Sequence, residues 1–149
     1  MKLLIITLLS INSIALFAQK VQMKNGVITV NKQPFLQYDC KHIHIQPCVF
    51  SSPVSGIKHF STMPYPYTEK VRVHKGGNTW VEEPRTAYYF HVKWIDGNQS
   101  FYTRQQMNWF IKALFNAKVI DDSGTVDSQK LDEFIKIHGE DKPIIININ

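Results

Sequence analysis

The segment from residue 86 to residue 95 alternates strictly between two sets of side chains, and this pattern constrains the fold more than any other. One set is strongly apolar and consists of Tyr88, Phe90, Val92 and Trp94, and the other consists of Tyr89, His91 and Lys93. Because successive side chains of a strand point to opposite faces, the alternation predicts a strand with one buried face. A turn sequence, Asp96-Gly97-Asn98, precedes Phe101-Tyr102, which is typical of an antiparallel hairpin.

Shorter segments extend this antiparallel meander toward the N-terminus. Residues 27–30 are β-branched, and residues 35–38 follow a turn-forming stretch, so the two predict a hairpin. Residues 71–74 alternate between apolar and polar and lead into Gly76-Gly77, a turn signal. Strands at this spacing favour an antiparallel meander with one buried face over βαβ units.

Two other segments have less regular patterns. Residues 51–68 contain three prolines and no clear period, so we expect most of this stretch to be a loop, with a short strand near residues 57–60. The tail from residue 143 to residue 149 is uncharged and rich in isoleucine. Because an exposed segment of this kind is an aggregation hazard, we expect it to close the sheet as a strand.

Two amphipathic helices are predicted at the C-terminal side of the strands. In the first, apolar residues recur with helical spacing at Met107, Phe110, Ile111, Leu114 and Phe115. Thr103 followed by Gln106 is the pattern of a capping box at its start. In the second, Asp127 is the expected N-cap and Gly139 the expected C′ residue. The chain therefore predicts one α+β domain over residues 19–149, an antiparallel β-meander with two C-terminal helices packed on one face.

Residues 1–18 have the organisation of an export signal. Lys2 precedes the apolar run 3–9, and Ala18 is a small residue before the expected cleavage site. The apolar run is too short to cross a bilayer, which takes about 20 residues. We therefore expect a signal peptide over residues 1–18, a secreted or periplasmic location, and no stable membrane insertion after cleavage.

Cys40 and Cys48 flank a segment with two histidines, His42 and His44. In an oxidising compartment two cysteines usually pair, so a disulfide is expected. A straight strand would hold the two Cα atoms about 26 Å apart, whereas a disulfide tolerates no more than about 7 Å. Either the chain reverses near residues 42–45, or the segment is a strand and the thiols stay apart.

A copper or zinc site is the alternative for this segment. Thiolate and imidazole ligands suit both metals, and the candidate ligands are Cys40, His42, His44 and Cys48. Their spacing matches no common zinc pattern, and exported thiolates tend to oxidise.

Signals for catalysis, cofactors and nucleic acid are weak in this sequence. It contains no G-x-S-x-G, no H-E-x-x-H and no glycine-rich phosphate loop. The net charge is +5, but the lysines are spread singly and form no basic cluster with interleaved aromatic residues. We therefore expect no cofactor and no nucleic-acid partner, and the sequence favours a protein that is not an enzyme.

Two motifs carry a resemblance to known proteins. The export signal is followed by NGVITVNKQPF at residues 25–35, and KVIDDSGTVDSQKLDEFIKIHGE occupies residues 118–140. Together they resemble a loosely defined group of small exported proteins of Bacteroidetes-type bacteria without an assigned function. The resemblance implies export and an α+β domain, and it brings no catalytic residues.

The sequence predicts a non-catalytic binding or interaction module, whose partner is a protein or a cell-surface component. The candidate contact residues are Met63, Tyr65 and Tyr67, because stiff aromatic side chains provide contact area at a low entropic cost. An extracytoplasmic hydrolase of cell-surface material is the alternative, which a convergent acid or nucleophile pocket would favour.

Overall fold

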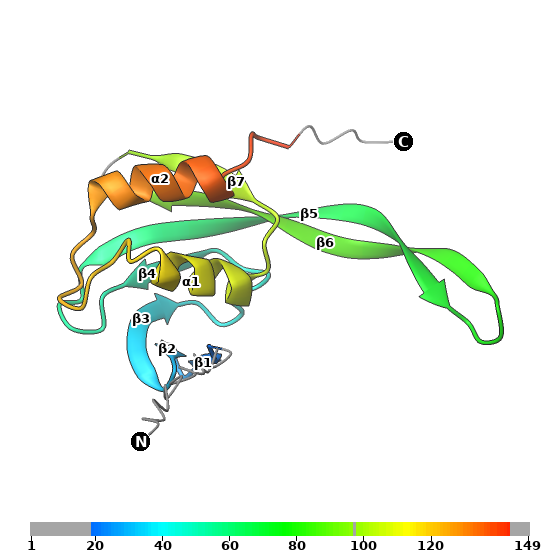
Figure 1. Ribbon diagram of the computed structural model, residues 1–149, viewed down its shortest axis with the longest axis horizontal. Coiled ribbons are helices and arrows are strands. Elements are labelled where there is room, and N and C mark those ends of the chain that lie inside the picture. Colours follow the sequence, from blue (N-terminus) through cyan, green and yellow to red (C-terminus); the bar gives the residue numbers. More distant parts are fainter. Residues whose placement is uncertain (1–18, 97, 144–149) are drawn as a thin grey trace, which may run out of the picture.

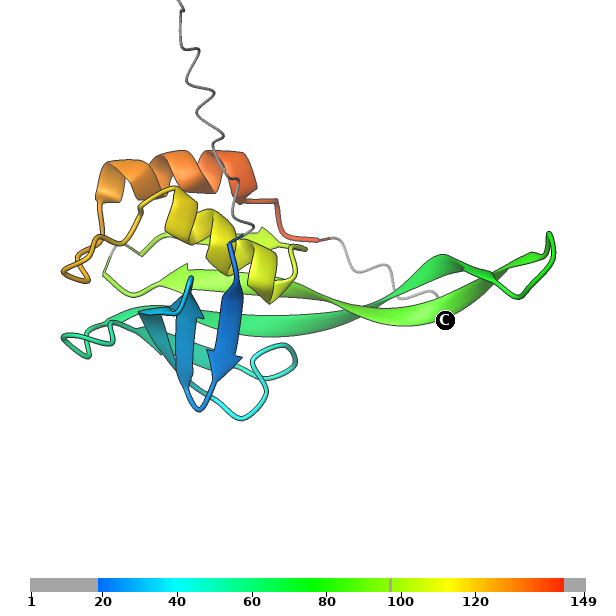
Figure 2. The ribbon, with the colours of Figure 1, turned by 60° about the horizontal axis from the view of Figure 1, so that its bottom comes forward.

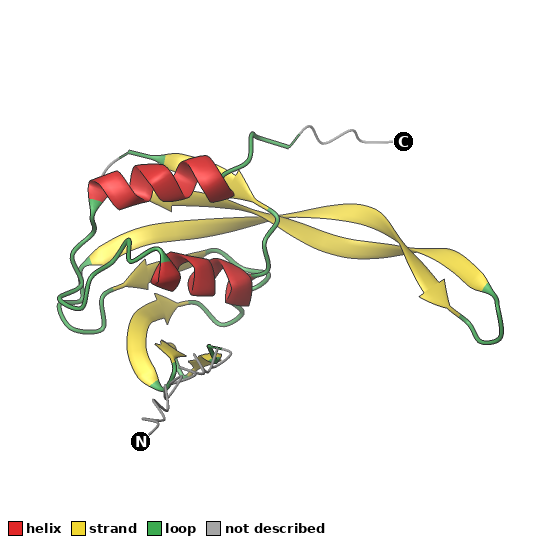
Figure 3. Ribbon diagram, in the orientation of Figure 1, coloured by secondary structure: helices red, strands yellow, loops and turns green. Residues whose placement is uncertain are grey.

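The computed structural model describes residues 19–96 and 98–143, so the expected signal peptide and residues 144–149 lie outside the described part. Seven strands form one antiparallel sheet in which every strand pairs with its neighbour in the chain. The strands are β1 (Val21–Lys24), β2 (Val27–Val30), β3 (Gln33–Asp39), β4 (Cys48–Ser51), β5 (Lys58–His74), β6 (Trp80–Trp94) and β7 (Ser100–Thr103). Two helices follow, α1 (Met107–Asn116) and α2 (Ser128–His138), and both lie on the same face of the sheet (Figures 1 and 3). The predicted α+β meander with two C-terminal helices is confirmed.

The sheet is strongly curved. Figure 2 shows β1 to β3 running across the direction of β5 and β6. The register shifts once between β2 and β3, at Ile28/Thr29, and once between β4 and β5, at Phe50/Ser51. Because a bulge bends a strand and increases its twist, these two irregularities favour a sheet that curls around the helices.

The core fills the space between the helices and the concave face of the sheet. The ring of Phe60 in β5 lies 5.9 Å from that of Phe110 in α1, and Phe101 in β7 lies 6.3 Å from Phe134 in α2. The apolar set predicted for β6 faces this core, since Phe90, Val92 and Trp94 are all buried. No helix in residues 19–96 or 98–143 has the length and apolar character needed to span a bilayer.

The ends of the helices differ in part from their prediction. The Asp127 carboxylate accepts hydrogen bonds from the backbone amides of Gln129 and Lys130, both at 3.1 Å, so the predicted N-cap of α2 is confirmed. The predicted capping box of α1 is wrong: α1 begins at Met107 and has no side-chain cap, and Thr103 Oγ1 instead accepts from the amide of Gln105 at 3.1 Å. A local turn has replaced the reciprocal cap.

Gly139 follows α2, as predicted, but for a different reason. It is extended, with φ of −77°, and therefore lacks the left-handed conformation of a C′ glycine. A Cβ atom at this position would lie 2.6 Å from the carbonyl oxygen of Ile135 and 3.2 Å from Cβ of Phe101. The close approach of the chain to α2 and β7 requires the glycine.

The short strand expected near residues 57–60 is the beginning of β5, and the prediction of a loop is wrong for the residues that follow, because β5 continues from Lys58 to His74. Pro64 and Pro66 lie inside this strand, opposite Phe90 and Tyr88 of β6, and the register continues through both pairs. Proline is compatible with a strand whose outer edge has no partner, and the pairing of β4 with β5 ends at Thr62.

The two longest strands project well beyond the rest of the sheet (Figure 1). We call this projection the arm, and it comprises residues 63–74 of β5 and 80–89 of β6, which lie beyond the pairing of β4 and β7. Cross-strand pairs support it, including Glu69 bonded to Arg85 and, at the tip, His74 beside Trp80 with ring centroids 4.8 Å apart. The sequence did not predict this element, because its alternation gave the strands but not their lengths.

We expect the two phenylalanines of α1 to differ in their contribution to stability. Phe110 is 1% exposed and contacts rings in three other elements, so Phe110→Ala is expected to lower the free energy of unfolding by about 3–5 kcal/mol. Phe115 is only partly buried, with its ring edge-on to Phe35 at 5.2 Å, so Phe115→Ala should cost less than half as much. Denaturant unfolding of the two variants measures both values, and an equal loss would contradict this placement of α1.

Candidate functional site

The cysteine segment forms a reversed loop held by a disulfide between Cys40 and Cys48, as predicted. Their Cα atoms are 5.1 Å apart, and the carbonyl oxygen of His42 accepts from the amides of Ile45 and Gln46 at 3.1 and 3.0 Å. These bonds turn the chain back within the loop, which excludes the straight strand considered above.

The loop does not assemble the copper or zinc ligands considered from the sequence. Both sulfur atoms are joined to each other, so neither Cys40 nor Cys48 offers a thiolate. His42 and His44 are exposed, while Ile43 between them is buried in the core. Over residues 19–96 and 98–143, no three His, Cys, Asp or Glu side chains gather as a metal site would require.

The candidate contact residues Met63, Tyr65 and Tyr67 share one face of β5 rather than lying on a loop. Phe60 and Thr62 alternate with them and are buried toward the helices, so the contact residues face the side of the sheet without helices. We call this surface the aromatic face, and its members are Met63, Tyr65, Tyr67, Tyr89, His91 and Tyr102.

The rings of the aromatic face cover one another across three strands. Tyr67 of β5 and Tyr89 of β6 have ring centroids 4.5 Å apart, and His91 of β6 stacks on Tyr102 of β7 at 4.5 Å with an interplanar angle of 11°. Tyr65 lies 6.5 Å from Tyr102 and is 38% exposed. The alternation of residues 86–95 predicts Tyr89 and His91 on a common face, whereas Tyr102 was not predicted to join them, although its alternation with Phe101 was a usable signal.

Ion pairs border the aromatic face. The guanidinium of Arg104 lies 5.4 Å from the ring centroid of Tyr89 and donates to Glu140 at 2.9 Å. Arg85 is bonded in the same way to Glu69. Burial, with the carboxylate of Glu69 nearby, raises the pKa of the Tyr67 hydroxyl above its usual range, so this hydroxyl remains a hydrogen-bond donor.

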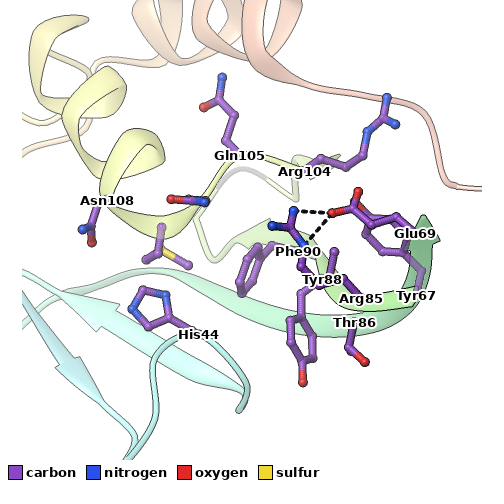
Figure 4. Close-up of a pocket in the computed structure, with 13 residues that line it drawn as sticks. His44, Tyr67, Glu69, Arg85, Thr86, Tyr88, Phe90, Arg104, Gln105 and Asn108 are labelled. Atoms are coloured by element: carbon purple, nitrogen blue, oxygen red, sulfur yellow. Dashed lines mark hydrogen bonds and ion pairs between the residues drawn. The ribbon is translucent and has the colours of Figure 1, made fainter. Parts of the chain in front are cut away.

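A cavity of about 620 Å³ lies at the root of the arm (Figure 4). We call it the arm-root cavity, and it is lined by the disulfide loop, β5, β6, and the start of α1. It brings together two residues singled out from the sequence, His44 and Tyr67, whereas Met63 and Tyr65 do not line it. Figure 4 shows His44 on one side and Glu69 with Arg104 on the other.

The charged residues of the arm-root cavity are held in ion pairs. The carboxylate of Glu69 lines the cavity and forms an ion pair with Arg85. Arg104, the second arginine of the lining, forms an ion pair with Glu140. A catalytic base needs a nucleophile or a reacting proton within hydrogen-bond distance. Apart from the Tyr67 hydroxyl, which donates to Glu69 at 3.5 Å, the side-chain hydrogen bonds of these charged residues run within the two ion pairs.

A second cavity of about 340 Å³ lies between the end of β6 and the start of α2. His59 lines it and is 2% exposed, because it is the extra residue of the β4–β5 bulge, which turns it toward the core beside Phe60. Burial lowers the pKa of His59, and the carboxylate of Asp96 only partly opposes this effect.

This second cavity does not form a catalytic triad, although His59, Asp96 and Ser128 all line it. Neither ring nitrogen of His59 has a hydrogen-bond partner, and both are buried. A nucleophile and its base must lie within hydrogen-bond reach of each other, and this arrangement does not meet that requirement. The described lining of this cavity therefore lacks the paired nucleophile and base of the hydrolase considered from the sequence.

Reduction of the Cys40–Cys48 bond should loosen the fold without abolishing it. The closed loop is short, so its chain entropy corresponds to about 2–3 kcal/mol of stability. Denaturant unfolding with and without reductant measures this loss. Since the chain has only these two cysteines, any effect of the reductant on the protein belongs to this bond, and an unchanged midpoint would contradict the prediction.

The buried His59 predicts a loss of stability on acidification. Unfolding frees the imidazole to bind a proton at its ordinary pKa near 6.5, whereas the folded protein holds that pKa lower. The contribution of His59 is therefore complete above about pH 6.5 and decreases as the pH falls below it. His59→Leu should weaken this pH dependence, measured as the difference in unfolding free energy between neutral and mildly acidic solution. An unchanged difference would show that His59 titrates equally in both states.

Comparison of the chain with protein-family models, with curated proteins and with solved structures finds no match.

Proposed function

We infer that this protein is a non-catalytic binding module of the periplasm or the cell exterior, and that the aromatic face is its contact surface. Export is the expectation raised by residues 1–18, and the Cys40–Cys48 disulfide supports it, because such bonds persist in oxidising compartments. The partner we propose is a protein surface.

The observation that carries this proposal is the cluster of stiff, partly exposed rings on the face of the sheet opposite the helices. Aromatic residues, methionine and arginine are the types enriched at protein interfaces. Met63 is 43% exposed and Tyr65 is 38% exposed, and the strands of the sheet hold both in place. Rings fixed in this way lose little conformational entropy when a partner covers them.

The shape of the aromatic face favours a protein over a small molecule. Of the charges around it, Arg85 is paired with Glu69 and Arg104 with Glu140, while Lys93 and Lys142 add positive charge near His91. A sheet face is also open rather than enclosed, and recognition of a small molecule normally requires a concave site that buries most of it.

Tyr65→Ala tests this surface directly. If Tyr65 is a central contact, its loss should weaken partner binding by about 1–2 kcal/mol, which corresponds to about 5- to 30-fold in affinity. The measurement is the capture of envelope proteins by the immobilised chain, followed by titration of the captured protein against the unmodified chain and the variant.

Trp109→Ala is the matched control, because Trp109 is an aromatic residue of α1 that is 63% exposed on another surface. The proposal requires that the same partner binds the Trp109 variant normally and the Tyr65 variant weakly. Equal weakening by both substitutions, or by neither, would refute the aromatic face as the contact surface.

A further inference from the structure

The backbone groups of β6 alternate in direction, and two hydrogen bonds fix which residues point outward. The amide of Ile95 donates to the carbonyl of His59 at 2.9 Å, toward β5. The amide of the preceding residue, Trp94, donates to the carbonyl of Gln99 at 2.8 Å, on the side of β7. Even-numbered residues of β6 therefore direct their backbone N–H and C=O groups away from β5.

This direction holds along the whole arm, because the register of β5 and β6 has no shift between Phe60↔Trp94 and His74↔Trp80. Strand β7 pairs with β6 only from Phe90 to Lys93. Thr86 and Tyr88 therefore present backbone donors and acceptors at an edge that no strand covers within residues 19–96 and 98–143. Both residues line the arm-root cavity.

Prolines occupy several of the other outward positions of the arm. Pro64 and Pro66 stand at the outward positions of β5, immediately after its last pairing with β4, and Pro84 stands at an outward position of β6. Each removes the donor that an incoming strand would need, which is how edge strands avoid unwanted pairing. Between Pro84 and the first residue paired with β7, the edge at Thr86 and Tyr88 has no such protection.

We propose that the C-terminal segment of this same chain, residues 144–149, adds as a short strand to the edge of β6 at Thr86 and Tyr88. This inference is independent of the aromatic face as a contact surface. The sequence predicts a C-terminal strand in the sheet but does not say at which edge. The proposal assigns residues 144–149 to the open edge of β6.

The place where the described chain ends supports this occupant. Glu140 exchanges two backbone hydrogen bonds with Tyr102 of β7, at 2.7 and 3.2 Å. Its carboxylate binds Arg104, whose guanidinium lies over the ring of Tyr89 in β6. At Glu140, three residues before Pro143, a single arginine side chain therefore lies between the chain and β6. In Figure 1 the described residues that follow α2 lie on the side of the body from which the arm projects.

The sequence and length of the segment fit the edge. Residues 144–149 read Ile-Ile-Ile-Asn-Ile-Asn, with four β-branched residues, no charge and no proline. Six residues extend about 20 Å at 3.3 Å per residue, and the distance from Tyr88 to Pro84 along β6 is about 13 Å on the same basis. A strand here covers the open edge of β6 with an apolar, β-prone segment, and open edges and segments of this composition both favour aggregation when they are left unpaired.

Hydrogen exchange of individual amides tests the proposal on the full chain. The amides of Thr86 and Tyr88 should exchange at least about tenfold more slowly than that of Thr68, an outward residue of the unpaired β5 edge that lies directly opposite Thr86. In a chain ending at Pro143, the Thr86 and Tyr88 amides should exchange as fast as that of Thr68. Equal rates in the full chain, or protection that survives the truncation, would overturn the proposal.

A pair of proline variants tests the same contact without truncation. Thr86→Pro removes an outward backbone N–H donor from β6. Thr68 of β5 is the cross-strand partner of Thr86, and Thr68→Pro removes the corresponding donor from the opposite edge of the arm. Carboxypeptidase should release the C-terminal residues faster from the Thr86 variant than from the unmodified chain, and at an unchanged rate from the Thr68 variant. Equal release from both variants would overturn the proposal. So would amide protection that rises with protein concentration, since the tail of a second copy would then occupy the edge.

Discussion

Phe60 is the side chain at which the sheet and the helices meet. Its ring stacks on Phe50 of β4 at 4.5 Å and lies 4.9 Å from Trp94 of β6 and 5.9 Å from Phe110 of α1. Protein interiors are packed too closely for one of these rings to move independently of the others. Because Phe60 and Trp94 are a cross-strand pair at the base of the long hairpin, this contact fixes the direction in which the arm leaves the body. The position of the aromatic face depends on it.

The sequence was sufficient to predict elements whose periodicity is local. Alternation placed Phe90, Val92 and Trp94 on the buried face of β6, and helical spacing placed Met107, Phe110 and Leu114 in the core. It failed for residues 61–68, since prolines usually indicate a loop and their tolerance here depends on the missing neighbour of β5. It also failed for the start of α1, because the geometry of a cap is set by how the chain leaves β7 and not by residue spacing alone.

The candidate site was predictable only in pieces. The sequence identified Met63, Tyr65 and Tyr67 by their chemistry but assigned them to a loop, and it placed Tyr89 and His91 together on a strand without their neighbours. The register between strands joins these pieces, and register depends on pairing between distant segments, which no single segment encodes. The disulfide loop illustrates the opposite case. There the expected disulfide, through the Cα separation that it permits, implied a reversal of the chain between Cys40 and Cys48, and the structure decides for it against the straight strand that the sequence left open.

The arm also determines how a pull from outside would be transmitted. Both of its strands are anchored in the body, so tension applied near Trp80 at the tip stretches them in the same direction and places little shear on the hydrogen bonds between them. The load passes instead to the root, where β5 pairs with β4 and β6 pairs with β7. Along those two ladders the force acts parallel to the strands, so several hydrogen bonds resist it together. The disulfide at Cys48 ties β4 to the preceding loop, so a covalent bond reinforces one of the two anchors.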